Sequence, residues 1–161
     1  MASLSDLSRD IAGILERAAA GIVRVDARRG RPATGIVWSD NLVLTADHVI
    51  EHDDAIQVSA GGAVAKAAVA GRDPGTDLAL LKTDGLTASP LARAASADVR
   101  IGHLVLAVGR TSELQVTLGI VSGLSGAFRS WRGGETERLI RQLRNSCPAF
   151  PAVPSSTATA G

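Results

Sequence analysis

Residues 42–50 of this chain read LVLTADHVI, and residues 72–82 read RDPGTDLALLK. The first stretch is a β-favouring apolar run that delivers His48 where the chain leaves a strand. The second makes a tight turn and then places Asp77 at the start of an alternating apolar strand. A neutral imidazole can accept a hydroxyl proton, and a carboxylate on its other ring nitrogen fixes the tautomer and stabilises the imidazolium. His48 and Asp77 together therefore predict the acid–base half of a hydrolytic site.

Taken singly, the two residues have ordinary explanations. A histidine at a strand end is more often a solvated loop residue than a catalyst, and an aspartate after a turn often bonds its own backbone. Asp73, in the same turn, could be confused with Asp77; we choose Asp77 because it directly precedes the apolar strand. The order histidine then aspartate fits the chymotrypsin arrangement rather than that of subtilisins or α/β-hydrolases.

Short apolar runs separated by Gly, Pro, Asp and Asn recur along the chain on both sides of His48. A first set comprises residues 21–25, 35–38, 42–45, 55–59, 64–70 and 77–82. A second set comprises residues 104–108, 115–124 and 137–142, with Gly133-Gly134 as a turn before the last run. Short strands at this spacing, with no helix between them long enough for a crossover, predict an all-β fold with antiparallel pairing.

The changes of pattern divide the chain into three parts. We expect an N-terminal amphipathic helix over residues 1–20, a β domain over 21–142, and an irregular tail over 143–161. Within the β domain we expect a first barrel over about 21–84, a polar linker over 85–100 and a partial second barrel over 101–142. Ser3 or Ser5 can cap the helix, whose mixed charges indicate packing over the sheet rather than binding to a membrane surface.

Three segments carry a resemblance to a known family. Residues 45–49, 77–82 and 116–124 resemble the histidine motif, the aspartate motif and a second-barrel strand pair of trypsin-like serine proteases of the bacterial HtrA/Deg type. The resemblance implies two β-barrels with the site in the cleft between them. It implies that His48 is the general base and acid, that Asp77 orients it, and that the substrate is a polypeptide; oligomers are implied by analogy. Asp47 departs from the family's usual small or amide residue, and we expect no effect on the triad.

The family's nucleophile loop, Gly-x-Ser-Gly-Gly-Pro, is missing from the chain as written. The tail offers Ser146, Ser155 and Ser156, none of which has flanking glycines to build an oxyanion hole, and Cys147, which is followed by a proline. Loss of the nucleophile from such a triad costs on the order of 10⁶ in turnover. The alternative functions are therefore a non-catalytic peptide-binding or scaffold module of the same fold, or a defective gene product.

The codons of residues 148–156 suggest that the missing serine is encoded in a different reading frame. Shifted by one base, with permitted third bases, the codons for PAFPAVPSS encode Pro-Gly-Phe-Ser-Gly-Gly-Pro-Leu-Val. This is the expected loop at the expected place, so we hypothesise that the chain beyond about residues 140–142 is the product of a frameshift. Chance in a GC-rich coding region is the competing explanation. Without the remaining strands, the second barrel would expose unpaired edges, and we expect poor solubility.

Composition argues against several other classes of protein. Aromatic residues make up only 2%, which disfavours stacking on single-stranded nucleic acid, and the net charge of +1 predicts neither a nucleic-acid nor a membrane partner. The single cysteine excludes an intrachain disulfide. We expect no signal peptide and no transmembrane segment, hence a cytoplasmic location by default. His52 and His103 lack zinc-type spacing, and we expect no metal and no cofactor.

Overall fold

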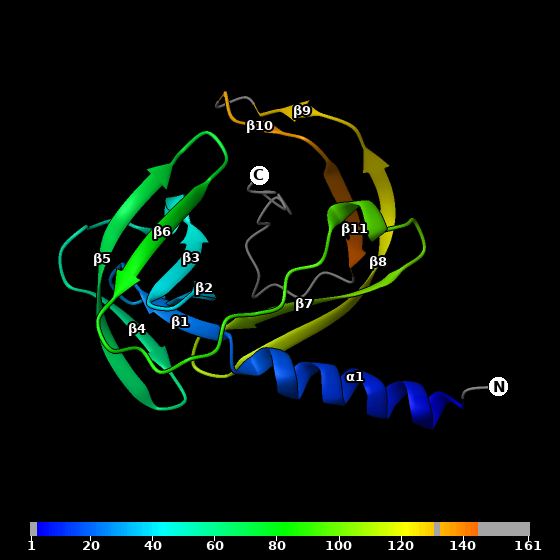
Figure 1. The fold of residues 1–161 in the computed structure, drawn as a ribbon, viewed down its shortest axis with the longest axis horizontal. Helices are drawn as coiled ribbons and strands as arrows, with labels where there is room; N and C mark the ends of the chain where they lie inside the picture. Colours follow the sequence, from blue (N-terminus) through cyan, green and yellow to red (C-terminus); the bar gives the residue numbers. More distant parts are fainter. Residues whose placement is uncertain (1–2, 131–132, 145–161) are drawn as a thin grey trace.

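A computed structural model describes residues 3–130 and 133–144 of the 161-residue chain. Six antiparallel strands form a closed barrel in the order β1-β2-β3-β6-β5-β4 (Figure 1). The strands are β1 (Ile22–Asp26), β2 (Ala33–Ser39), β3 (Leu42–Ala46), β4 (Ile56–Ala60), β5 (Ala63–Asp73) and β6 (Leu78–Thr83). Closure pairs both sides of every strand, so the barrel has no free edge. The first barrel is complete, as the sequence predicts.

Small aliphatic side chains fill the inside of this barrel. Because successive residues of a strand point to opposite faces, alternate positions share the interior. Val25 stands opposite Val58 on the neighbouring strand, and Val43 stands opposite Leu81; all four are fully buried. Cross-strand pairs of this kind fix the register, since a slip by one residue would expose them.

The largest difference from the predicted strands in this barrel is at β5. The sequence predicts that this strand ends at residue 70, where a glycine and charged residues interrupt the apolar pattern. The observed strand continues to Asp73, with an irregularity in its pairing between Val69 and Gly71. An irregularity of this kind absorbs an extra residue and lets the ladder continue. It carries Arg72 and Asp73 to the end of the barrel where His48 lies.

The second half of the domain is an open sheet in the order β11-β8-β7. It is built from β7 (Leu104–Arg110), β8 (Leu114–Ser125) and β11 (Leu139–Arg144), and a two-stranded hairpin of β9 (Phe128–Arg129) and β10 (Glu135–Thr136) lies between β8 and β11 in the chain. The three longer strands agree with the prediction. The hairpin strands were not predicted, because two-residue strands leave no hydrophobic alternation to detect.

One face of the open sheet is apolar and exposed. Leu104 pairs with Ile120, Ile120 also pairs with Leu143, and Leu118 and Val116 follow on the same face of β8. All five side chains are exposed. Among residues 3–130 and 133–144, no further strand pairs with the outer edges of β7 and β11. An exposed apolar face beside such edges favours association between chains, so poor solubility remains our prediction.

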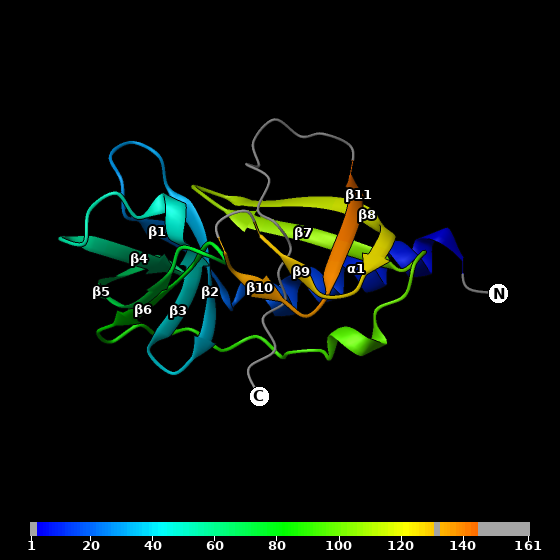
Figure 2. The same ribbon diagram turned by 90° about the horizontal axis from the view of Figure 1, so that it is seen from above.

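Helix α1 (Leu4–Ala19) precedes the barrel and runs beside β7 (Figures 1 and 2). Ser3 caps it: its side chain accepts from the Asp6 N–H, and the Asp6 carboxylate accepts from the Ser3 N–H. At the other end Arg110 of β7 donates to the carbonyl of Ala19. No residue of α1 is buried, so the expected packing over the sheet is slight. No helix in the described part of the chain combines the length and apolarity needed to cross a bilayer.

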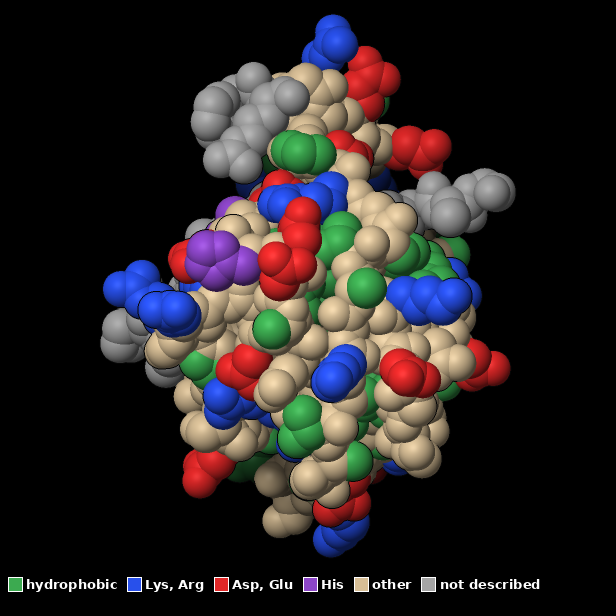
Figure 3. Space-filling view, turned by 90° about the vertical axis from the view of Figure 1, so that its left-hand side faces the viewer, with side chains coloured by type: hydrophobic (Ala, Val, Ile, Leu, Met, Phe, Trp, Pro, Cys, Tyr) green, Lys and Arg blue, Asp and Glu red, His purple; other side chains and the backbone are tan. Residues whose placement is uncertain are grey.

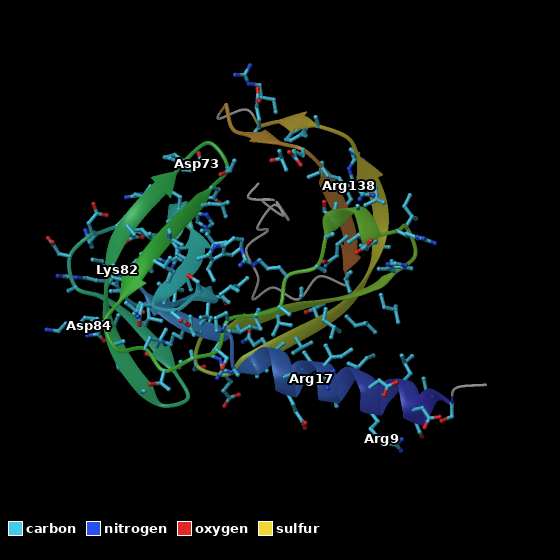
Figure 4. All side chains as sticks on the ribbon, viewed as in Figure 1. Arg9, Arg17, Asp73, Lys82, Asp84 and Arg138 are labelled. Atoms are coloured by element: carbon cyan, nitrogen blue, oxygen red, sulfur yellow. The ribbon has the colours of Figure 1, made fainter. Side chains whose placement is uncertain are left out.

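The segment between the two halves is tied to both of them. It contains a short 3₁₀ helix, η2 (Ser96–Asp98), within the polar linker predicted from the sequence. Arg138, just before β11, donates to the carbonyls of Ser96 and Val99 (Figure 4). Arg93 of the same segment stacks its guanidinium over Trp38 of β2 at 4.2 Å from the ring centre.

Candidate active site

The register of two paired strands brings His48 and Asp77 together. β3 and β6 are antiparallel, and Ala46, the last residue of β3, stands opposite Leu78, the first of β6. The residues just beyond these ends therefore meet, although they are far apart in the sequence. His48 lies in the 3₁₀ turn η1 (Asp47–Val49), and Asp77 closes the turn before β6.

Three hydrogen bonds join the His48 turn to Asp77. The His48 Nδ1 lies 2.7 Å from Asp77 Oδ2, and the His48 backbone N–H donates to Oδ1 at 2.9 Å. The Asp47 N–H donates to the Asp77 carbonyl at 3.1 Å. Both carboxylate oxygens of Asp77 therefore bond His48, one at its backbone N–H and the other at its ring, and this fixes the plane of the imidazole. Nδ1 is the donor when the ring is neutral and bound in this way, and Nε2 is left as the acceptor.

The exposure of the two side chains suits proton transfer. The His48 side chain is 34% exposed, whereas that of Asp77 is 16% exposed. The histidine can therefore reach a substrate while the carboxylate stays behind it. Figure 3, which shows the side of the molecule formed by the barrel, has histidine side chains at the surface next to acidic and basic side chains.

The backbone of Asp77 is in a conformation that few side chains tolerate. Its φ is +59°, in the left-handed region, where aspartate and asparagine are the most common residues after glycine. This conformation turns the chain sharply between the Asp73 turn and β6. The identity of residue 77 is therefore constrained by the turn as well as by the contact with His48.

Asp73 has a different place in the structure. Its Oδ1 accepts from the N–H groups of Gly75 and Thr76 at 3.0 and 3.3 Å, and its Oδ2 accepts from the Thr76 hydroxyl at 2.6 Å. It lies at the turn between β5 and β6 (Figure 4). Asp73 therefore shapes the turn that presents Asp77, and its described hydrogen bonds do not include His48.

Protonation of Asp73 is expected to loosen this turn in acid. The Thr76 hydroxyl, helped by the N–H groups of Thr76 and Gly75 and opposed by partial burial, holds the pKa of Asp73 below its ordinary value of 3.8. A lowered pKa in the folded state stabilises the turn above 3.8, and this stabilisation is lost as the pH falls through the lowered value. The amide proton shifts of Gly75 and Thr76, followed by NMR, should show an inflection below 3.8.

An Asp73→Asn variant is the control for this titration and should lack the inflection. An inflection of the Gly75 and Thr76 amides at or above 3.8 in the unaltered chain would contradict the expectation.

The hairpin from the second half contacts the back of the same turn. The Ser130 hydroxyl donates to the carbonyl of Gly75 at 2.7 Å and accepts from the N–H of Gly134 at 3.1 Å. Gly134 lies against Gly75 so closely that a Cβ at position 134 would come within 2.3 Å of the Gly75 carbonyl carbon. The sequence indicated only a turn at Gly133-Gly134. It gave no signal that this turn packs against the residues before Asp77.

Replacing Gly134 with alanine is therefore expected to displace the hairpin from the turn. The added methyl would lie 2.3 Å from backbone atoms of Gly75, which cannot move aside as a side chain can. Overpacking of this kind costs about 1–3 kcal/mol of unfolding free energy, measurable by urea denaturation. Gly126→Ala is the matched control, since a Cβ there has no atom within 4 Å. Equal effects of the two substitutions would count against the described contact.

The remaining predicted residues are placed as follows. His52 is an exposed residue of the loop after η1, and His103 accepts from the Arg100 N–H before β7. Within residues 3–130 and 133–144, no three His, Cys, Asp or Glu side chains form a group that could hold a metal ion. Ser146, Cys147, Ser155 and Ser156 lie outside the described residues, as does the segment whose codons suggest a frameshift.

Comparison with known proteins supports the resemblance seen in the sequence. Residues 33–153 match the family model for a trypsin-like peptidase domain. The chain is 36% identical over 127 residues to mouse (Mus musculus) "Serine protease HTRA4", a match that covers 70% of this chain and 26% of that protein. It is 37% identical over 107 residues to a "Probable periplasmic serine endoprotease DegP-like" of Pseudomonas fluorescens, covering 63% of this chain and 22% of that protein. The chain thus spans about a quarter of the length of these curated relatives.

Solved structures share the fold. The crystal structure of Deg5 superposes with a TM-score of 0.76 at 24% identity, covering 88% of this chain and 76% of that one. The serine endoprotease from Yersinia pestis gives a TM-score of 0.62 at 28% identity, covering 78% of this chain and 52% of that one.

Proposed function

This chain belongs to the trypsin-like serine proteases of the HtrA/Deg type, and from that premise we propose that it carries the proton-transfer half of an endopeptidase site. In this proposal His48 is the general base and acid, and Asp77 is its orienting carboxylate. The contact between His48 Nδ1 and Asp77 Oδ2 at 2.7 Å is the observation that carries the proposal. With Nδ1–H bound to Asp77, the outer nitrogen Nε2 accepts the proton of an attacking hydroxyl. It later returns that proton to the leaving amine, while Asp77 stabilises the imidazolium.

The proposed substrate is a polypeptide, and the proposed nucleophile is a serine encoded one base out of frame. We propose that the loop Pro-Gly-Phe-Ser-Gly-Gly-Pro follows when the chain is read in the shifted frame after about residues 140–142. The glycines of such a loop allow two backbone N–H groups to face the oxyanion. We call the protein read in that frame the frame-restored protein. The 161-residue chain is proposed to be inactive as a protease, because none of its tail serines has the flanking glycines that build an oxyanion hole.

Sequencing the gene from about codon 130 onward, followed by fluorophosphonate labelling, tests the proposal. The frame-restored protein is expected to take one label on the loop serine and to hydrolyse casein, whereas the 161-residue chain is expected to take none. A frame-restored His48→Ala protein is the control and should remain unlabelled. A folded frame-restored protein that takes no label would overturn the proposal, as would a gene without any shifted frame that encodes the rest of a second barrel.

The second candidate is a non-catalytic peptide-binding or scaffold module. The absence of a Gly-x-Ser-Gly-Gly-Pro loop from the sequence as written favours it. Binding of an unfolded polypeptide by the 161-residue chain, unchanged in a His48→Ala variant, would support this candidate. The cytoplasmic location and the oligomeric state remain predictions, which cell fractionation and analytical ultracentrifugation would check.

A further inference from the structure

One arginine joins β5 to both ends of the turn that carries His48. The Arg72 Nε donates to Asp47 Oδ1 at 2.5 Å, and its Nη2 lies 3.4 Å from the carbonyl oxygens of both Asp47 and Ile50. Asp47 begins the 3₁₀ turn, and Ile50 follows it directly. A planar guanidinium can serve several acceptors in a fixed arrangement, so this contact holds the entry and the exit of the turn together.

The partner of Arg72 is a buried carboxylate. The Asp47 residue is 6% exposed, and burial of an unpaired carboxylate is strongly unfavourable. The hydrogen bond that Arg72 donates to Asp47 raises the pKa of Arg72; burial opposes this to a lesser extent, and attraction to Asp47 and Asp53 adds to the rise. The guanidinium therefore remains charged and neutralises Asp47 next to the histidine.

The charges around the turn come from the turn itself, from the two strands β5 and β6, and from the loop that follows the turn. Asp77 faces the imidazole from the start of β6, and Asp47 belongs to the turn itself. Arg72 reaches it from the end of β5 and also contacts Asp53 in the following loop at 3.3 Å. With Asp47 paired to Arg72, Asp77 is the carboxylate that bonds the His48 ring.

We propose that Arg72 is a positioning residue for His48: by neutralising the buried Asp47 and holding the turn, it keeps the imidazole bound to Asp77 through Nδ1. This inference rests on the proposed function of His48 and Asp77. It differs from the expectation that aspartate at position 47 has no effect on the triad, and the test below decides between the two. In place of a small or amide residue, this chain has a charge that requires a partner, and the continuation of β5 to Asp73 supplies one.

The test is a measurement of the His48 tautomer in the 161-residue chain. The ¹⁵N shifts of the imidazole report which ring nitrogen carries the proton, and the unaltered chain is expected to hold the proton on Nδ1. Arg72→Met should abolish the dominance of this form, because Asp47 is left buried without a counter-charge. The double variant Asp47→Asn/Arg72→Met should regain it, since no charge then needs a partner. If Arg72 only stabilised the fold and had no influence on the imidazole, Arg72→Met would leave the tautomer unchanged.

Arg24→Met is the matched control. Arg24 bonds Asp26 through Nε and Nη2, at 2.7 Å each, and its side chain has the same 35% exposure as that of Arg72. It should leave the His48 tautomer unchanged. If Arg72→Met does not fold, Arg72→Lys and the double variant carry the test, since neither leaves an uncompensated carboxylate, and both should keep the proton on Nδ1.

The outcomes separate this inference from the proposed function. If the unaltered chain does not hold the proton on Nδ1, or if Asp77→Asn leaves the tautomer unchanged, the proposed function and this inference both fail. If the unaltered chain behaves as expected but Arg72→Met leaves the tautomer unchanged, this inference alone is overturned. Failure of the double variant to regain the Nδ1–H form would also overturn it.

Discussion

Replacing His48 with alanine in the frame-restored protein is expected to lower the turnover number for casein by a factor on the order of 10⁶. In the proposed mechanism the imidazole is the proton acceptor for the nucleophile and the donor to the leaving group, and a serine hydroxyl without it is a weak nucleophile. Its loss therefore costs about as much as loss of the whole triad. The initial rate at saturating casein, measured against the unaltered frame-restored protein, gives the ratio.

His52→Ala is the control for this substitution. His52 is an exposed histidine four positions further on, outside the turn that contacts Asp77, and its removal should change turnover by less than about twofold. The unfolding free energy of the His48→Ala protein should stay close to that of the parent, because the His48 side chain is one third exposed. A His48→Ala protein that keeps a tenth or more of the parent's activity would remove His48 from the mechanism.

Replacing Asp77 with asparagine is expected to lower turnover by about 10⁴, less than loss of His48. The amide keeps the shape of the carboxylate, but its NH₂ group can donate to Nδ1 and so favours the tautomer with the proton on Nε2. That tautomer cannot accept a proton from the nucleophile. The turn itself should survive, because asparagine also tolerates the left-handed backbone at φ +59°. Turnover and the imidazole ¹⁵N shifts, measured on the same protein, should change together.

Asp73→Asn distinguishes the two aspartates of the turn. Asp73 bonds Gly75 and Thr76 rather than His48, so its substitution should cost far less activity than that of Asp77. Equal losses from the two substitutions, at equal unfolding free energy, would argue that the acid has been assigned to the wrong residue.

Local patterns in the sequence were enough to predict the elements that hold the dyad. The apolar runs that form β3 and β6 are visible in the chain, and so are the ends of these runs, beside which His48 and Asp77 lie. The contact between Asp47 and Arg72 was not predicted. It depends on the irregularity in β5 that carries Arg72 to the turn, and such a change of register has no reliable signature in one sequence.

The contact between the β9–β10 hairpin and Gly75 was not predicted, for a related reason. Two glycines indicate a turn, but the partner of Gly134 lies on a different half of the domain, more than fifty positions earlier in the chain. Packing between distant segments follows from the relative placement of the two sheets. Periodicity within each segment does not determine that placement.

The closed barrel also bears on how the domain opens. Local unfolding proceeds in cooperative units, and units rich in buried apolar side chains open last. Six of the largest fully buried side chains belong to the barrel, whereas the open sheet contributes Val121; the six are Val23, Val25, Val43, Ile56, Val58 and Leu81. His48 and Asp77 are both attached to the barrel, and the proposed serine follows the sheet. We therefore expect the two parts of the proposed catalytic apparatus to open as separate cooperative units. A genetic change that abolishes the nucleophile would then leave the proton-transfer pair folded and in place.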